Sequence, residues 1–328
     1  MYLEHYQLER KPFQIDADPS FLWLGEKQKE ALAVLKYGLH ESTGCLVLTG
    51  DAGAGKTTII KALPRILGEN DRIVVIGDPS LEKMDFFNRI AAEFRMPGDY
   101  TSKGPFIRDF HSVLLAHHYR GKRVLLILDE AQLLTRELLE ELRLLSNLEK
   151  NGSRLLRIFF VGQLELNETL LRPENKALRQ RITVNYNIDP LTEKEVGEYI
   201  QFRLGVGGGE GKLFSGDAIR EIFRFSQGNP RLINVIADRA LLTGFVRSDR
   251  HINKSIIQEC MRELDISRTI SLNVRNSGGI AFEETGGKTA GKGFRRAWIL
   301  YPAMAALMVI VLYLLSGRIL EILPPSLF

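Results

Sequence analysis

The chain has 328 residues, of which 45% are hydrophobic, so it is longer than one average domain of about 100–200 residues and has enough apolar material for a large core. A formal net charge of only +4 excludes a strongly basic protein and is weak support for nucleic-acid binding. Two distant cysteines, Cys45 and Cys260, exclude a disulfide framework and a cysteine metal cluster, and we expect two reduced, buried thiols.

Strands and helices are predicted to alternate through the first 190 residues. The polar lead-in over residues 1–25 lacks the apolar run of a secretory signal peptide. Continuous apolar runs predict buried strands at 45–50, 72–79, 123–134 and 155–162. Helical patterns lie at 26–42, 56–67, 84–94, 107–119 and 136–149. We expect Pro64 to end or bend the second helix. The alternation predicts one parallel-sheet α/β domain over residues 1–190.

A second, smaller domain is predicted from Leu191 to residue 268. Its sequence has four helical stretches with polar joins, at 192–204, 215–226, 230–245 and 252–264. Three polar residues stand where a helix begins and are expected to cap it, namely Ser215, Asn229 and Asn253. The pattern favours a small all-helical domain that accompanies the α/β domain as a lid.

The C-terminal part contains a candidate membrane helix. Residues 269–296 are rich in Gly, Ser, Asn and Thr and are predicted to be a flexible linker. Ala297–Ser316 has no charged residue and as a helix would span about 30 Å, the thickness of the bilayer core. Basic residues cluster before this run, so residues 1–296 are expected in the cytoplasm and 317–328 outside it. The alternative is a buried core helix.

The stretch from Gly50 to Thr57, GDAGAGKT, matches the phosphate-binding pattern G-x-x-x-x-G-K-[ST]. It follows an apolar strand and opens a helix, which is the structural context that this motif requires. The lysine, Lys56, is expected at the β and γ phosphates, and the Thr57 hydroxyl is expected to bind Mg²⁺. The residues predicted to bind the nucleotide are Gly50, Asp51, Ala52, Gly53, Ala54, Gly55, Lys56, Thr57 and Thr58.

An acidic pair, Asp129 and Glu130, follows the strand VLLIL. An aspartate at a strand end can hold the Mg²⁺ shell, and the following glutamate can polarise the attacking water. A kinase or a small GTPase has no need of this glutamate, so the pair favours ATP hydrolysis with ATP and Mg²⁺ as cofactors. The alternative is that the pair only caps the next helix.

Four further polar residues are candidates for contacts with the nucleotide. Gln163 follows the strand RIFFVG and can hydrogen-bond the γ-phosphate or the water, or is a turn residue. Arg179 and Arg181 are candidates for an arginine finger that reaches a neighbouring subunit's nucleotide, or are solvated surface residues. Arg231 lies just inside a helix start and can reach the γ-phosphate from the helical domain.

The phosphate-binding motif and the acidic pair, followed in order by Gln163, Arg181 and the GNPR start of a helix, resemble an AAA+ ATPase. The segments LDEAQLL, LEELRLLSNLE, VGQLEL, LRQRI and QGNPRLINVIADRALL further resemble the ExeA-like family, the general secretion pathway protein A ATPases. The resemblance covers residue 1 to about residue 265. It implies a P-loop core with a helical lid, and a homo-oligomer, ring or dimer, with a finger acting in trans.

The resemblance also implies a single-pass ATPase at the bacterial inner membrane. Its partners would be components of type II secretion, of a mannose-sensitive haemagglutinin-type pilus or of exopolysaccharide export. Secretion members carry a peptidoglycan-binding domain after their membrane helix, whereas only a short tail follows Gly317 here. Direct peptidoglycan binding is therefore not expected.

Two other functions are open from sequence alone. One is a DNA-associated AAA+ ATPase akin to transposition regulators, which share much of this layout. The predicted membrane helix and the absence of a concentrated basic stripe argue against nucleic acid as a partner. The other is an ATP-dependent switch or scaffold with low turnover.

Overall fold

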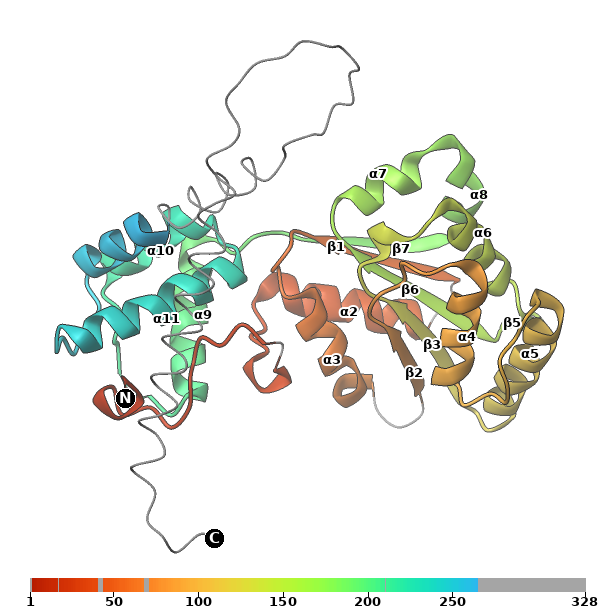
Figure 1. Ribbon diagram of the computed structural model, residues 1–328, viewed down its shortest axis with the longest axis horizontal. Helices are drawn as coiled ribbons and strands as arrows, with labels where there is room; N and C mark the ends of the chain where they lie inside the picture. The colour runs from red at the N-terminus through yellow and green to blue at the C-terminus, as the bar shows by residue number, and fades with distance from the viewer. Residues whose placement is uncertain (1, 17, 41–43, 68–70, 210, 265–328) are drawn as a thin grey trace, which may run out of the picture. The chain divides into compact units, whose positions relative to one another are not determined.

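The computed structural model describes residues 2–16, 18–40, 44–67, 71–209 and 211–264 (Figure 1). These residues all belong to one compact unit. The predicted linker and membrane helix lie outside the described residues. Within the described ranges, no helix is both long enough and apolar enough to cross a bilayer.

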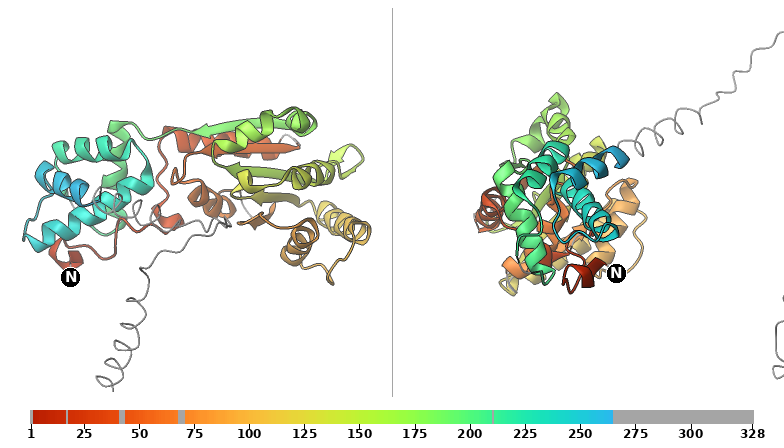
Figure 2. Two further views of the ribbon diagram at one scale, coloured as in Figure 1. Left: turned by 45° about the horizontal axis from the view of Figure 1, so that its top comes forward. Right: turned by 90° about the vertical axis from the view of Figure 1, so that its left-hand side faces the viewer.

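A five-stranded parallel sheet forms the centre of the first part of the chain (Figures 1 and 2). The strands run in the order β2-β3-β6-β1-β7, and each pair of neighbours is parallel. Their bounds are β1 Cys45–Gly50, β2 Asp71–Ile76, β3 Arg123–Leu128, β6 Leu156–Gly162 and β7 Ile182–Ile188. The predicted parallel α/β fold is confirmed.

Helices cover both faces of the sheet because side chains alternate along each strand. Along β1, Cys45 and Val47 pack on one face, and Leu46 and Leu48 pack on the other. The face of Leu46 is covered by α2 Glu26–His40 and α3 Lys56–Leu67. The opposite face is covered by α4 Lys83–Glu93, α5 Lys103–Tyr119, α6 Arg136–Leu145, α7 Glu165–Leu171 and α8 Lys176–Arg179. Three-residue 3-10 helices lie at η1 Pro19–Phe21, η2 Ala131–Leu133 and η3 Pro173–Asn175.

Some predicted elements differ from the observed ones. The strand expected over 123–134 ends at Leu128, because Glu130 adopts a left-handed backbone with φ of 52° and η2 follows. The helix expected over 136–149 ends at Leu145, and a hairpin of β4 Glu149–Lys150 and β5 Ser153–Arg154 follows its last turn. Pro64 was expected to end or bend its helix; it lies inside α3, which continues to Leu67, so it does not end the helix.

The described end of the chain is helical. It contains α9 Glu193–Val206, α10 Gly216–Ser226, α11 Pro230–Val246 and a further helical stretch over 254–264 (Figure 1). The three expected caps are confirmed. The Ser215 side chain accepts from the N–H of Ala218, that of Asn229 from Arg231 and Leu232, and that of Asn253 from Ile256.

The first residues of the chain pack with these helices rather than with the sheet (Figure 1). Helix α1, Tyr2–His5, brings Tyr2 against α11, where the Tyr2 hydroxyl donates to Asp238 at 2.6 Å. Leu8 and Phe13 are buried in the same hydrophobic cluster. The lead-in therefore crosses from the helical part of the chain, residues 191–264, to the start of α2, and it passes the cavity described below.

Candidate nucleotide-binding site

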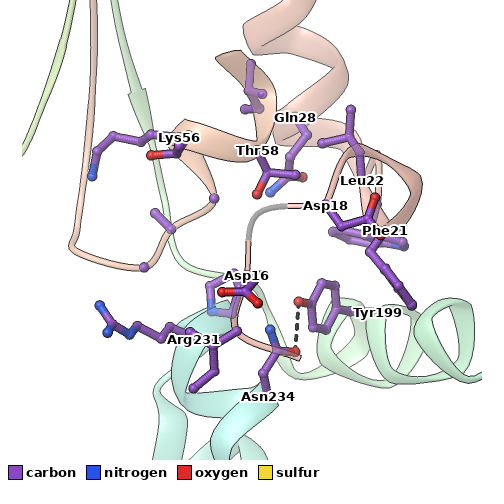
Figure 3. A pocket seen from close by; sticks show the side chains of 18 of the residues that line it. Asp16, Asp18, Phe21, Leu22, Gln28, Lys56, Thr58, Tyr199, Arg231 and Asn234 are labelled. Atoms are coloured by element: carbon purple, nitrogen blue, oxygen red, sulfur yellow. Dashed lines mark hydrogen bonds between the residues drawn. The ribbon is translucent and has the colours of Figure 1, made fainter. Parts of the chain in front are cut away.

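A cavity of about 460 Å³ opens where the carboxyl ends of the central strands meet the helical part of the chain (Figure 3). Its lining comes from the lead-in and the first turn of α2, the glycine-rich turn and the start of α3, the residues that follow β3 and β6, Leu191 with α9, and the start of α11. Strand order explains this convergence, since β3, β6 and β1 are neighbours in a parallel sheet and their carboxyl ends lie along one edge.

The glycine-rich turn has the backbone of a phosphate cradle. Gly53 and Gly55 have φ of 87° and 95°, a backbone conformation that residues other than glycine rarely adopt. Lys56 is buried and its ammonium donates to the carbonyls of Gly50, at 2.7 Å, and Asp51, at 2.9 Å. Burial lowers the pKa of Lys56, and the carboxylates of Glu130 and Asp129 act in the opposite direction. The turn and the lysine fit a phosphate chain.

Thr57 and Asp129 come together below this turn. The Thr57 hydroxyl donates to Asp129 Oδ2 at 2.9 Å, and Asp129 Oδ1 accepts the backbone N–H of Glu130 at 3.0 Å. Burial raises the pKa of Asp129, against the effect of the Thr57 hydrogen bond. A hydroxyl and a carboxylate are the hard oxygen ligands that Mg²⁺ prefers, and Mg²⁺ commonly uses only one or two protein ligands beside phosphate oxygens. The pair therefore fits Mg²⁺.

Two glutamine side chains hold the carboxylate of Glu130. Gln132 Nε2 donates to Glu130 Oε2 at 2.6 Å, and Gln163 Nε2 donates to the same oxygen at 3.4 Å. The backbone N–H of Gln163 in turn donates to Gln132 Oε1 at 3.0 Å. Glu130 and Gln163, the predicted base and polar sensor, both line the cavity, and these two roles stay predictions. Gln132 is not among the residues predicted from sequence. Its position, two residues after Glu130, was the feature that could have indicated a contact with that carboxylate.

The start of α11 closes on the glycine-rich turn. Arg231 lines the cavity, and Asn229 Nδ2 donates to the carbonyl of Ala52 at 2.8 Å. A Cβ on Gly53 would lie 2.5 Å from Arg231 Cβ and 2.8 Å from Asn229 Oδ1. Gly53 is thus needed twice, for its backbone conformation and for the close approach of the helix.

We expect Gly53→Ala to destabilise the protein by about 1–3 kcal/mol more than Gly55→Ala. Both substitutions impose the same left-handed backbone on alanine, whereas nothing lies within 4 Å of a Cβ placed on Gly55. Urea denaturation of the two variants isolates the contact between the turn and α11. Equal losses of unfolding free energy would contradict the packing described.

The two candidate finger arginines lie away from the cavity. Arg179 Nη1 donates to the carbonyls of Leu170, at 3.3 Å, and Leu171, at 3.0 Å, at the end of α7. Arg181 precedes β7, at the end of the sheet where Ile182 pairs with Cys45. The glycine-rich turn follows the other end of β1, about 20 Å away for a six-residue strand. Arg181 therefore cannot reach the phosphates of its own subunit.

The lead-in contributes a cavity wall that sequence reasoning missed. Phe21, Leu22 and Trp23 line the cavity. The lead-in is fixed by the buried Arg203, which donates to the carbonyls of Pro12 and, at 3.0 Å, Gln14. The Arg203 guanidinium also lies 4.5 Å from the centre of the Phe21 ring. The signal was the apolar run FLWL directly before a helix.

Comparisons with known proteins agree with this geometry. The family model described as "AAA domain" matches residues 39–170. General secretion pathway protein A of Aeromonas hydrophila is 40% identical over 253 residues, which cover 77% of this chain and 46% of that protein. The chain therefore spans about half the length of this relative.

Two further similarities are more distant. ATP-dependent target DNA activator B of Escherichia phage D108 is 27% identical over 70% of this chain and 69% of its own. The structure of the Aeropyrum pernix ORC2 protein in its ADP form matches with a TM-score of 0.59 at 15% identity, over 78% of this chain and 72% of that one, and shows the fold alone. The chain thus contains the AAA domain of an ATPase, and over 77% of its length it is similar to general secretion pathway protein A.

Proposed function

We propose that this chain binds ATP with Mg²⁺ and hydrolyses it to drive or time the assembly of a bacterial envelope system. The candidates are type II secretion, a pilus or exopolysaccharide export. The observation that carries the proposal is the 40% identity to general secretion pathway protein A, over 253 residues of this chain. The chain covers less than half of that relative, so its apparatus and partners belong to the proposal.

The proposed reaction uses the candidate residues of the site. Lys56 and the turn from Gly50 to Thr58 bind the phosphates, and Thr57 and Asp129 hold Mg²⁺. Mg²⁺, when bound, neutralises charge on the phosphate oxygens. Glu130 accepts the proton of the attacking water, and Gln163 orients that water or the γ-phosphate. Arg231 contacts the γ-phosphate from the helical part, so that its loss is sensed there.

The proposal extends to assembly and location. In the proposed chain an ATPase domain over 1–190 is followed by a helical lid over 191–268, a linker over 269–296, a membrane helix over 297–316 and a tail over 317–328. Subunits associate as a ring or dimer in which Arg181 serves the neighbouring nucleotide. The single membrane helix holds the ATPase at the cytoplasmic face of the inner membrane.

Capture of partners tests this proposal. A Glu130→Gln chain is expected to hold ATP, whereas Lys56→Ala loses the charge that faces the phosphates and serves as the matched control. Both are purified from solubilised membranes of the native host, and co-purifying proteins are identified by mass spectrometry. Enrichment of secretin, pilus or polysaccharide-export components with Glu130→Gln alone is expected. Enrichment of transposase-like or other DNA-bound proteins would contradict it.

A DNA-associated ATPase is the second candidate. It is favoured by the 27% identity to a phage protein whose name describes an ATP-dependent activator of target DNA. Salt-dependent binding of duplex DNA by the chain would support this function over the first, because neutralising phosphates releases counterions and gives a steep salt dependence.

A further inference from the structure

Side-chain hydrogen bonds join α7 to the strand that leads into the glycine-rich turn. Asn167, on α7, donates through Nδ2 to the Thr49 hydroxyl at 3.1 Å. The same hydroxyl donates to Asn187 Oδ1, on β7, at 3.2 Å. Thr49 directly precedes Gly50 and is completely buried. Because its hydroxyl donates to one amide and accepts from the other, α7, β1 and β7 are held in one arrangement at this point.

The bond between Asn167 and Thr49 lies between two parts of the candidate site. At one end, Gln163 lines the cavity and is tied to the start of α7, since its carbonyl accepts the N–H of Leu166 at 3.0 Å. At the other end, Thr49 is followed at once by the glycine-rich turn. Neither Asn167 nor Thr49 lines the cavity, so neither contacts a nucleotide bound there. Their bond acts on the site only through the residues that it holds.

The other contacts of α7 do not fix its distance from β1. Leu166 and Leu170 are buried in the hydrophobic cluster on this face of the sheet, and no side chain caps the first turn of the helix. Apolar contact is non-directional, so it holds a short helix against a sheet without setting its exact position. A hydrogen bond has a defined length and direction and does set it. The Asn167 amide is therefore the contact that defines where α7 begins relative to the turn.

We propose that Asn167 is a positioning residue for ATP hydrolysis. Its bond to Thr49 sets the distance between the Gln163 amide and the phosphates held by the glycine-rich turn. This inference rests on the proposed function, in which Gln163 orients the water or the γ-phosphate. The alternative is that Asn167 only pairs a buried hydroxyl, which would stabilise the fold and leave the chemical step unchanged.

Asn167→Leu, which keeps the size of the side chain and removes the amide, tests the inference in the full-length chain. It is expected to lower kcat about 10- to 100-fold, the effect of misplacing a catalytic contact by about 1 Å. ATP affinity, measured by calorimetry, is expected to stay at the wild-type value, because Lys56 and the turn are intact. Thr49→Val breaks the same bond from the other side and is expected to lower kcat equally. Thr49→Ser restores the hydroxyl and is expected to recover kcat.

Combination with Gln163→Ala shows whether Asn167 acts through Gln163. Gln163→Ala is expected to lower kcat by itself, and Asn167→Leu is expected to cause no further fall in that background, because the contact that it positions is already gone. Asn185→Ala is the matched control. Asn185 donates to the Asn167 side-chain oxygen at 3.4 Å, so its loss leaves the bond to Thr49 in place and kcat is expected to stay unchanged.

Two results would overturn the inference and leave the proposed function standing. One is the same fall in kcat from Asn167→Leu with and without Gln163→Ala. The other is a wild-type kcat in both Asn167→Leu and Thr49→Val. A Gln163→Ala chain with wild-type kcat would overturn the proposed role of Gln163 and the inference with it. A wild type that hydrolyses no ATP would overturn the proposed function itself.

Discussion

Replacing Glu130 with Gln is expected to lower kcat for ATP hydrolysis by about 10²–10⁴-fold while ATP binding is retained. The amide has the size of the carboxylate but cannot accept a proton from water. The phosphate-binding residues, Lys56 and the turn around it, are unchanged, so the variant still binds ATP. Phosphate release under saturating ATP measures kcat, and equilibrium binding of ATP measures affinity.

Glu137→Gln is the matched control for this prediction. Glu137 is an exposed residue of α6 that pairs with Lys83 at 2.7 Å, and it is not part of the cavity. Its replacement is expected to leave kcat unchanged. Wild-type turnover in Glu130→Gln would remove Glu130 as the base. Negligible turnover in the wild type, even when oligomerised on membranes, would favour a switch or scaffold.

The prediction depends on how Glu130 is held. Its carboxylate accepts from both Gln132 and Gln163, so it is oriented before a nucleotide arrives. An oriented carboxylate loses little entropy when it meets the attacking water, and effective positioning is a large part of catalysis in phosphoryl transfer. Gln132 also bonds the backbone of Gln163, which ties the ends of β3 and β6 together.

The parts of the site that could be predicted from the sequence are those whose conformation is determined by residues nearby in the chain. The glycine-rich turn follows from the residue types between β1 and α3, because only glycine adopts the backbone of Gly53 and Gly55 readily. The meeting of Glu130 and Gln163 at one edge of the sheet follows from the parallel arrangement of β3 and β6. Both arguments need only the chain near each residue and the class of sheet.

The parts that sequence missed depend on contacts between distant segments. Phe21 lies in the cavity wall beside Arg203, a residue far along the chain that also holds the carbonyls of Pro12 and Gln14. No periodicity in the lead-in encodes a partner that lies in α9. The capping position of Ser215, in contrast, needs only the next turn of its own helix.

The structure also distinguishes the two candidate finger arginines, Arg179 and Arg181, which the sequence alone could not do. Arg179 donates to two carbonyls at the end of α7, which leaves its guanidinium engaged within the subunit. Among the described residues no side-chain hydrogen bond or ion pair is seen for Arg181. A guanidinium that acts on a neighbouring subunit must be available to it, so Arg181 is the stronger candidate for the finger.

Arg181→Ala is expected to lower kcat by about 10³–10⁵-fold and to retain ATP binding, because an arginine finger stabilises charge only in the transition state. Because Arg181 lies far from the glycine-rich turn of its own subunit, a sharper test is possible.

This test mixes Arg181→Ala subunits with Lys56→Ala subunits. Where the intact glycine-rich turn of an Arg181→Ala subunit meets the intact Arg181 of a Lys56→Ala subunit, the interface contains every group that hydrolysis requires. Random assembly of equal amounts makes about one interface in four of this kind. The mixture is therefore expected to hydrolyse ATP although each variant alone does not, and Arg179→Ala is expected to lose stability instead. A mixture as inactive as its components would leave Arg181 without a role in trans.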